Sequence, residues 1–330
     1  MAEEAPRILV TGCCGFIGFH LCRQLFKEGW AVVGWDTESV HYPTTTIRAD
    51  RKAQLLKEAP TNFIYKDVNI EDARGVEEGW VSGIEVVCHL AARAGVRESL
   101  THPAPYITTN LLGHFHVLDK ARRENASHFL YASSSSVYGK DAAIPFKESD
   151  PCNTPISLYA ATKKADELMC FSYSHLYGLA TTGLRFFTVY GPWGRPDMAV
   201  YDFSDRIRTN RPITVFNHGN NRRAFTYVDD VVSGILACIK APPTPRLQPP
   251  FKVYNIGSSE MSTTLRLIEL LESHLGAKAK LEFTGPVACD MEETGADLTA
   301  LQDDLHYKPS VNIEEGIAKF MAWYRAFYKL

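Results

Sequence analysis

The segment from Arg7 to Gly18, RILVTGCCGFIG, constrains the fold of this chain most strongly. An apolar run ends in a glycine-rich stretch, and the apolar residues that follow recur with the period of a helix. We therefore expect a buried strand, a tight turn and the start of a helix. Glycine lets a backbone approach a pyrophosphate closely, and the unpaired amides of a helix N-terminus favour the negative charge. The predicted dinucleotide-binding residues are Gly12, Gly15, Phe16, Ile17 and Gly18.

A carboxylate follows the next apolar run. Residues 31–35 read AVVGW and lead directly into Asp36. In dinucleotide-binding folds an acid at the end of the second strand binds the adenosine ribose hydroxyls. Because Asp36 would repel a ribose phosphate, the sequence favours NAD over NADP. Arg48 and Arg51 lie downstream and leave NADP open.

Tyr159 and Lys163 form a second candidate site. They are four residues apart, and on a helix such residues lie one above the other. An ammonium beside a phenol favours the phenolate and so prepares it to act as a base. Taken alone, the pair is more simply explained by a packed tyrosine and a solvated lysine. The glycine-rich turn and the serine run described next favour the catalytic interpretation.

Four serines, residues 133–136, directly follow the apolar run at 129–132 and are closed by Val-Tyr-Gly. Serine runs usually form flexible linkers. This one follows a buried-strand pattern, so we expect its hydroxyls on a strand-end loop, where parallel sheets place their sites. Bonding of such a hydroxyl, for example that of Ser134, to nearby backbone is the alternative.

Together with His89-Leu90-Ala91-Ala92, these motifs resemble the extended short-chain dehydrogenase/reductase superfamily that acts on nucleotide sugars. The chain is most similar to the UDP-glucuronate 4-epimerases. The similarity is carried by LYAATKKA from Leu158, YSHLYG from Tyr173, TGLRFFTVYGPWGRPDMA from Thr182 and FTYVDD from Phe225. It runs almost end to end and is weakest at residues 37–60, 241–250 and 284–296.

The resemblance implies roles for further residues. Ser134 would bond the sugar 4-oxygen, and Ser135, Ser136, Thr188 and Arg195 would hold the glucuronate carboxylate. Arg223 would bind the diphosphate, and Asp290 would lie on the nucleotide side. The further cofactor contacts would be Asp67, Val68, Leu90, Ala91, Ala92, Tyr159 and Lys163. The chain departs from the family pattern at Ala224, where relatives commonly carry Asp, and within residues 289–297, which puts the uridine pocket in doubt.

Short apolar strands alternate with helical segments from residue 7 to about residue 187, at 8–10, 31–35, 62–65, 85–89, 129–132 and 180–187. This alternation predicts an α/β fold with a doubly wound parallel (Rossmann) sheet. A short strand at 213–216 and helices at 265–275 and 313–328 follow. We therefore expect an NAD-binding domain at 1–187 and a smaller C-terminal α/β domain at 188–330 that mainly binds the UDP-sugar. By resemblance, segments near 225–256 return to the large sheet.

The resemblance implies an NAD-dependent isomerase that inverts carbon 4 of UDP-glucuronate, giving UDP-galacturonate through a transient 4-keto intermediate. A UDP-glucuronate decarboxylase and a UDP-glucose/galactose 4-epimerase are the alternatives. Nucleotide-sugar dehydratases carry an Asp-Glu pair where this chain has Ser135 and Ser136, so dehydration is excluded. A non-catalytic NAD-binding protein would usually lack Tyr159 or Lys163, and both are present. The resemblance also implies a homodimer through helices near residues 103–123 and 155–177.

A net charge of −3 gives no excess of basic charge for nucleic acid. The eight cysteines show no zinc spacing, so no metal is expected, and the adjacent Cys13 and Cys14 are read as small residues that fit the turn. No apolar run reaches membrane length. We therefore expect a cytoplasmic protein without membrane or nucleic-acid partners.

Overall fold

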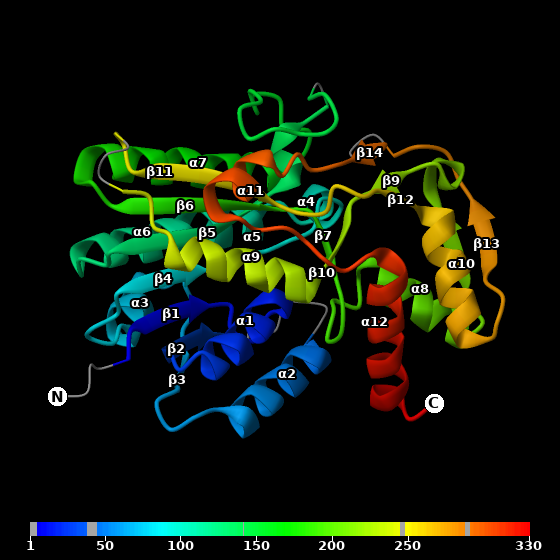
Figure 1. Ribbon diagram of the computed structural model, residues 1–330, viewed down its shortest axis with the longest axis horizontal. Helices are drawn as coiled ribbons and strands as arrows, with labels where there is room; N and C mark the ends of the chain where they lie inside the picture. Colours follow the sequence, from blue (N-terminus) through cyan, green and yellow to red (C-terminus); the bar gives the residue numbers. More distant parts are fainter. Residues whose placement is uncertain (1–4, 38–44, 141, 245–247, 288–290) are drawn as a thin grey trace.

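The computed structural model describes residues 5–37, 45–140, 142–244, 248–287 and 291–330. Figure 1 shows a large sheet sandwiched between helices, with a smaller group of helices and short strands beside it. The α/β fold class with a doubly wound parallel sheet is confirmed.

The large sheet has seven strands in the order β11-β6-β5-β4-β1-β2-β3. Every neighbouring pair in it is parallel. The order of the first six strands is that of a Rossmann fold. β2 and β3 lie on one side of β1 and β4 to β6 on the other, and such folds bind their ligands at this point of the sheet, where the strand order reverses. The strands are β1 Arg7–Thr11, β2 Ala31–Asp36, β3 Ile64–Asp67, β4 Val86–His89, β5 His128–Ser134, β6 Ala180–Phe186 and β11 Phe251–Ile256.

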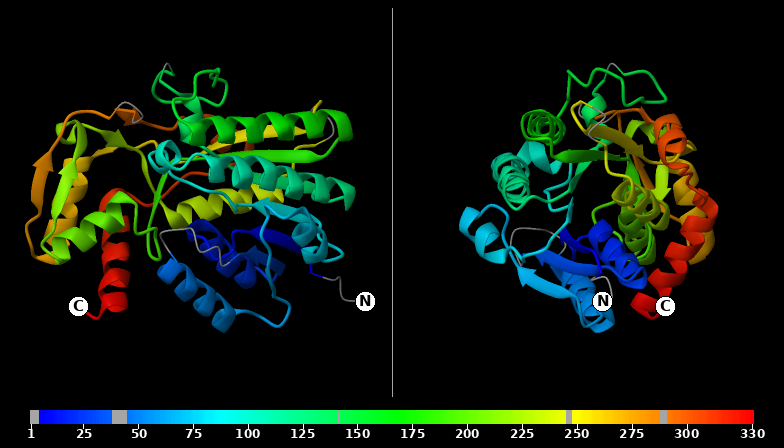
Figure 2. Two further views of the ribbon diagram at one scale, coloured as in Figure 1. Left: turned by 180° about the vertical axis from the view of Figure 1, so that it is seen from behind. Right: turned by 60° about the vertical axis from the view of Figure 1, so that its left-hand side comes forward.

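Helices cover both faces of this sheet, as the end-on view in Figure 2 shows. Leu21 and Val231 belong to one buried cluster with Val10, and Val117 and Cys170 belong to the cluster on the opposite face. On the first face lie α1 Phe16–Lys27, α2 Thr45–Glu58, α9 Val228–Lys240 and α11 Thr299–Leu305. On the second lie α3 Ala73–Gly79, α6 His114–Arg123 and α7 Leu158–Tyr177. Shorter turns are α4 Glu98–Thr101, α5 Ala104–Tyr106, the π-helical η1 Ile107–Gly113 and the 3₁₀ turn η2 Ser135–Tyr138.

The smaller part has its own core, in which Tyr201, Leu267 and Phe320 are buried together. Its helices are α8 Ala199–Arg208, α10 Thr264–Leu275 and α12 Ile313–Tyr328. Its strands and short turn are β7 Thr188–Tyr190, β8 Pro212–Val215, η3 Phe216–Gly219, β9 Arg222–Arg223, β10 Phe225–Tyr227, β12 Ser262–Thr263, β13 Lys280–Phe283 and β14 Glu293–Thr294. These strands form three small sheets.

The helices expected at 265–275 and 313–328 and the strand expected at 213–216 are present with nearly the same bounds. The third strand of the large sheet begins two residues later than expected, at Ile64. Among the described helices, none is both long and apolar enough to cross a membrane.

Candidate active site

A cleft of 1240 Å³ lies between the carboxyl ends of the large sheet and the smaller part. It gathers almost all of the predicted site residues. Those that line it are Gly12, Gly15, Phe16, Ile17, Gly18, Asp36, Val68, Leu90, Ala91, Ala92, Ser134, Ser135, Ser136, Tyr159, Lys163, Thr188, Arg195 and Arg223. Asp67 is exposed at the end of β3 and is not among the lining residues, so its cofactor contact stays a prediction. Asp290 lies outside the described residues.

The glycine-rich turn packs so tightly that side chains would not fit. Gly12 has φ +71°, and a Cβ there would lie 2.9 Å from the backbone nitrogen of Ala91. A Cβ on Gly18 would collide with the carbonyl oxygen of Gly12. Within the described chain no side chain caps the start of α1, so its first amides face the cleft as a helix N-terminus suited to a phosphate. This backbone fits the pyrophosphate of a dinucleotide.

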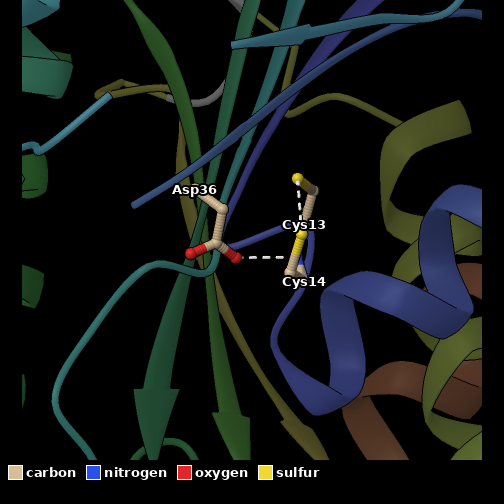
Figure 3. Close-up of side chains that lie close together, drawn as sticks. All are labelled: Cys13, Cys14 and Asp36. Carbon is tan, nitrogen blue, oxygen red and sulfur yellow. Dashed lines mark hydrogen bonds between the residues drawn. The ribbon is translucent and has the colours of Figure 1, made fainter. Parts of the chain in front are cut away.

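Asp36 is held at the end of β2 beside this turn (Figure 3). Its Oδ2 accepts a hydrogen bond from the backbone of Cys14 at 2.7 Å, and its Oδ1 accepts one from the backbone of Thr37 at 2.8 Å. Arg48 pairs with the same carboxylate. The position fits a ribose-binding acid, and Arg48 supplies a positive charge next to it.

Cys13 and Cys14 lie beside Asp36, with their sulfur atoms 3.8 Å apart (Figure 3). The two sulfur atoms and one carboxylate oxygen of Asp36 lie within 4.8 Å of one another, which is close enough for the three residues to bind one metal ion. However, the Asp36 carboxylate already accepts hydrogen bonds from two backbone amides, and the Arg48 guanidinium beside it opposes a cation. Both cysteines are buried and fit the predicted role of small residues filling the turn.

Tyr159 lies in the first turn of α7. Ser157 caps the helix by accepting a hydrogen bond from the Ala160 amide at 3.1 Å. The Tyr159 amide donates to the Ser99 hydroxyl at 3.3 Å, and the Tyr106 ring lies edge-on to the Tyr159 ring at 6.2 Å. These contacts from a neighbouring segment orient the phenol at the cleft, one helical turn before Lys163.

Lys163 is almost fully buried and is paired with a carboxylate that the sequence analysis missed. Its Nζ lies 3.1 Å from Oδ2 of Asp166, which has no solvent exposure. Burial raises the pKa of the Asp166 carboxyl to about 7, against the opposing effect of Lys163. His114 lies 3.8 Å from the other oxygen, and burial lowers the pKa of its imidazole well below the usual value, so it is neutral. The spacing of three residues on one helix was the available signal for Asp166.

The serine run spans the end of β5 and the start of η2, and buried hydrogen bonds hold its first residue in place. Ser133 donates to Glu167 at 2.7 Å, and Arg185 donates to both oxygens of Glu167 at 2.8 and 2.9 Å. Burial alone would raise the pKa of Glu167, but Arg185 outweighs it and the pKa is lowered. Ser134 accepts a hydrogen bond from the Ser136 amide at 3.2 Å, while its hydroxyl also lies 2.9 Å from that of Ser136. Ser134 therefore caps the η2 turn and still lines the cleft.

Arg195 reaches the cleft from the smaller part. Its guanidinium donates to both carboxylate oxygens of Asp197, at 3.0 and 2.5 Å, and to the carbonyl of Ala94 at 3.3 Å. Asp197 therefore occupies the edge of the Arg195 guanidinium that Nε and one terminal nitrogen form. Arg223 donates to the carbonyls of Met291 and Glu292 at 2.6 and 2.9 Å. It thereby holds the backbone next to the undescribed residue 290.

The sequence profile of the NAD dependent epimerase/dehydratase family matches residues 8–257. The chain belongs to this family. Within it, Protein CapI of Staphylococcus aureus is 43% identical over 98% of this chain and 99% of its own length. The probable UDP-glucuronate 4-epimerase of Rhizobium meliloti (strain 1021) is 39% identical over 98% of either chain.

One solved structure similar to this epimerase/dehydratase family member contains both a cofactor and a sugar nucleotide. It is the crystal structure of the UDP-glucuronic acid 4-epimerase from Bacillus cereus in complex with UDP-glucuronic acid and NAD. It matches with a TM-score of 0.87 and 32% sequence identity, covering 98% of this chain and 100% of that chain.

Proposed function

We propose that this protein is an NAD-dependent isomerase that inverts carbon 4 of UDP-glucuronate to give UDP-galacturonate through a transient 4-keto intermediate. The observation that carries this proposal is the placement of Tyr159, Lys163 and Arg195 in one cleft with the glycine-rich turn. The cleft thus combines a proton-transfer pair, a dinucleotide-binding turn and a group that binds acids. The relatives named above with the same substrate support the assignment.

Tyr159 is the proposed acid and base. When bound, NAD supplies a hydride acceptor and donor at carbon 4. The Tyr159 phenolate removes the proton of the 4-hydroxyl and returns it after the sugar has presented its other face. The Lys163 ammonium stabilises the phenolate, and the Ser134 hydroxyl bonds the 4-oxygen.

Arg195 is the proposed ligand of the glucuronate carboxylate, together with Ser135, Ser136 and Thr188. A guanidinium binds a carboxylate through two parallel hydrogen bonds. Asp197 accepts hydrogen bonds from Nε and one terminal nitrogen of Arg195, so it orients the guanidinium at the cleft.

The remaining assignments complete the proposal. Arg223 and Asp290 bind the nucleotide end of the substrate, and residues 1–187 with the returning segments near 225–256 bind NAD. Residues 188–330 bind mainly the UDP-sugar. The free cysteines of the described chain fit a reducing compartment, so we propose the cytoplasm as the location.

Decarboxylation and epimerisation of neutral UDP-sugars are not favoured. Loss of carbon dioxide from a β-keto acid requires the carboxylate to become less stable, and the hydroxyls of Ser135 and Ser136 with Arg195 stabilise it instead. The direct experiment is to incubate the purified protein with UDP-glucuronate and resolve the products by proton NMR. UDP-galacturonate as the main product supports the proposal. UDP-pentose as the main product, or turnover of UDP-glucose alone, refutes it.

We also propose that two copies associate through α7 and the η1–α6 segment, which lie side by side on one face of the sheet (Figure 2). These helices expose a set of large apolar side chains: Ile107, Leu112, Phe115, Leu168, Phe171, Leu176 and Tyr177, which are between 42% and 67% exposed. Large apolar side chains exposed on neighbouring helices are typical of an interface. Light scattering at micromolar concentration tests this. A dimer mass for the wild type that falls to a monomer mass for Leu168→Glu supports the interface, and a wild-type monomer refutes it.

A further inference from the structure

The loop from Gly191 to Arg195, called here the 191–195 loop, contains a strained residue. The Gly194 amide donates to the Gly191 carbonyl at 3.1 Å, which closes a four-residue turn with Pro192 second and Trp193 third. Trp193 has φ +60°, a conformation that such turns normally give to glycine. A bulky residue held there costs free energy, so the surrounding structure must hold it in place.

The Trp193 side chain is held by aromatic rings from both parts of the protein. Its ring lies 5.5 Å from Phe19 of α1, 5.5 Å from Trp323 and 5.4 Å from Phe327 of α12. The loop backbone is held separately. His20 of α1 donates to the Pro192 carbonyl at 2.8 Å, and this fixes one end of the turn.

Arg51 of α2 holds the other end. It is only 2% exposed, and its guanidinium donates to the carbonyl of Trp193 at 2.9 Å and to that of Gly194 at 3.1 Å. Gly194 directly precedes Arg195, so Arg51 fixes the two peptide groups that aim the proposed acid-binding side chain.

The same guanidinium also contacts the cofactor side of the cleft. It donates to the Cys14 carbonyl at 3.3 Å, and the Cys14 amide is the group that donates to Asp36. A continuous chain of hydrogen bonds therefore runs from Asp36 through Cys14 and Arg51 to the 191–195 loop. Arginine suits this position because its planar guanidinium presents several donors in a fixed geometry, which lysine lacks.

We propose that Arg51 is a positioning residue that fixes the 191–195 loop against the cofactor-binding turn and so sets the selectivity of the cleft for acid sugars. The selectivity part rests on the proposed function, in which Arg195 binds the substrate carboxylate. The positioning part rests only on the hydrogen bonds of Arg51.

The test compares Arg51→Met with Arg23→Met. Arg23 also ties α2 to α1, but its guanidinium donates to Glu58, at 2.5 and 3.1 Å, and not to the carbonyls of the 191–195 loop that Arg51 holds. Both variants are purified with NAD. Dissociation constants for UDP-glucuronate and UDP-glucose are measured by calorimetry, and amide hydrogen exchange is followed in peptides that cover residues 191–198.

In Arg51→Met we expect the preference for UDP-glucuronate over UDP-glucose to fall about tenfold, because a misplaced binding group loses much of its effect. Exchange in the 191–198 peptide should also become about tenfold faster, because lost hydrogen bonds permit local opening. Arg23→Met should change neither quantity more than about twofold. Arg51→Lys should lower the sugar preference and speed the amide exchange in the same way, but by less. If Arg51→Met does not fold, Arg51→Lys tests the proposal.

Unchanged exchange in both Arg51 variants would overturn the positioning role. Faster exchange with unchanged sugar preference would overturn the selectivity role. A wild-type protein that binds the two sugars equally would instead refute the proposed substrate, and the exchange data would still decide the positioning role.

Discussion

The Lys163 ammonium lies 3.1 Å from the Asp166 carboxylate, and neither side chain is more than 4% exposed. A buried cation needs a partner, because removing charge from water is costly unless a counter-charge compensates. Asp166 therefore holds the Lys163 side chain in place on the helix that carries Tyr159. The second oxygen of Asp166 has no hydrogen-bond partner among the described residues.

This pair predicts a specific pH dependence of stability. Because burial raises the pKa of Asp166 from 3.8 to about 7, the folded protein keeps a proton there between these pH values while the unfolded chain has released it. The free energy of unfolding therefore falls as the pH rises through this window. In urea titrations from pH 4 to pH 7, the wild type should lose roughly 2 to 4 kcal/mol more than Asp166→Asn. Parallel pH profiles for the two proteins would show that Asp166 is already ionised at low pH.

Replacing Tyr159 by Phe should keep the fold and the bound cofactor but lower turnover of UDP-glucuronate about 100-fold to 10,000-fold, the usual contribution of a positioned acid or base. Tyr177→Phe is the matched control, because Tyr177 lies at the far end of the same helix and is exposed. Near-normal turnover in Tyr159→Phe would remove this residue from the mechanism.

Arg195→Met should reduce kcat/KM for UDP-glucuronate by about ten- to a hundredfold more than any turnover of UDP-glucose, since a charge-assisted hydrogen bond contributes roughly 1.5 to 3 kcal/mol. Some UDP-pentose should appear, because the carboxylate of the keto intermediate is no longer held. Arg211→Met, which removes an exposed arginine beyond α8, serves as the control. Equal losses for both sugars would show that Arg195 serves the fold or the diphosphate.

Gly18→Ala should yield a folded protein that purifies without NAD, because the new methyl group would push the Gly12 carbonyl out of the turn. Gly285→Ala is the control, since a Cβ there meets no atom within 4 Å. The amount of bound NAD in each purified variant is measured from the ratio of absorbance at 260 and 280 nm and from the NAD released on denaturation. Retention of a full complement of NAD by Gly18→Ala would contradict the proposed role of this turn.

Six strands of the large sheet could be predicted from sequence because each contains a short apolar run, whereas the return of β11 to this sheet was implied only by the family resemblance. The short strand β7 could not be predicted, because its partner β10 begins at Phe225, far along the chain, and neither strand is long enough to show a pattern. The glycine-rich turn, Asp36 and the serine run could also be placed in one cleft, because the carboxyl ends of parallel strands meet at one edge. The roles of Thr188, Arg195 and Arg223 were implied by the family resemblance. The pairing of Arg195 with Asp197 and the burial of Asp166 depend on how the chain packs, which no local pattern encodes.

The position of β11 has a consequence for how the chain is made. β11 pairs with β6 along its full length, yet about sixty-five residues, which include α9 and strands of the smaller part, separate the two strands in sequence. While the ribosome is still producing those residues, β6 is an open sheet edge, although all of its residues are buried in the finished fold, and unpaired edges of this kind are prone to aggregate. This edge of the sheet therefore stays open until residues 251–256 have been made and have paired with β6.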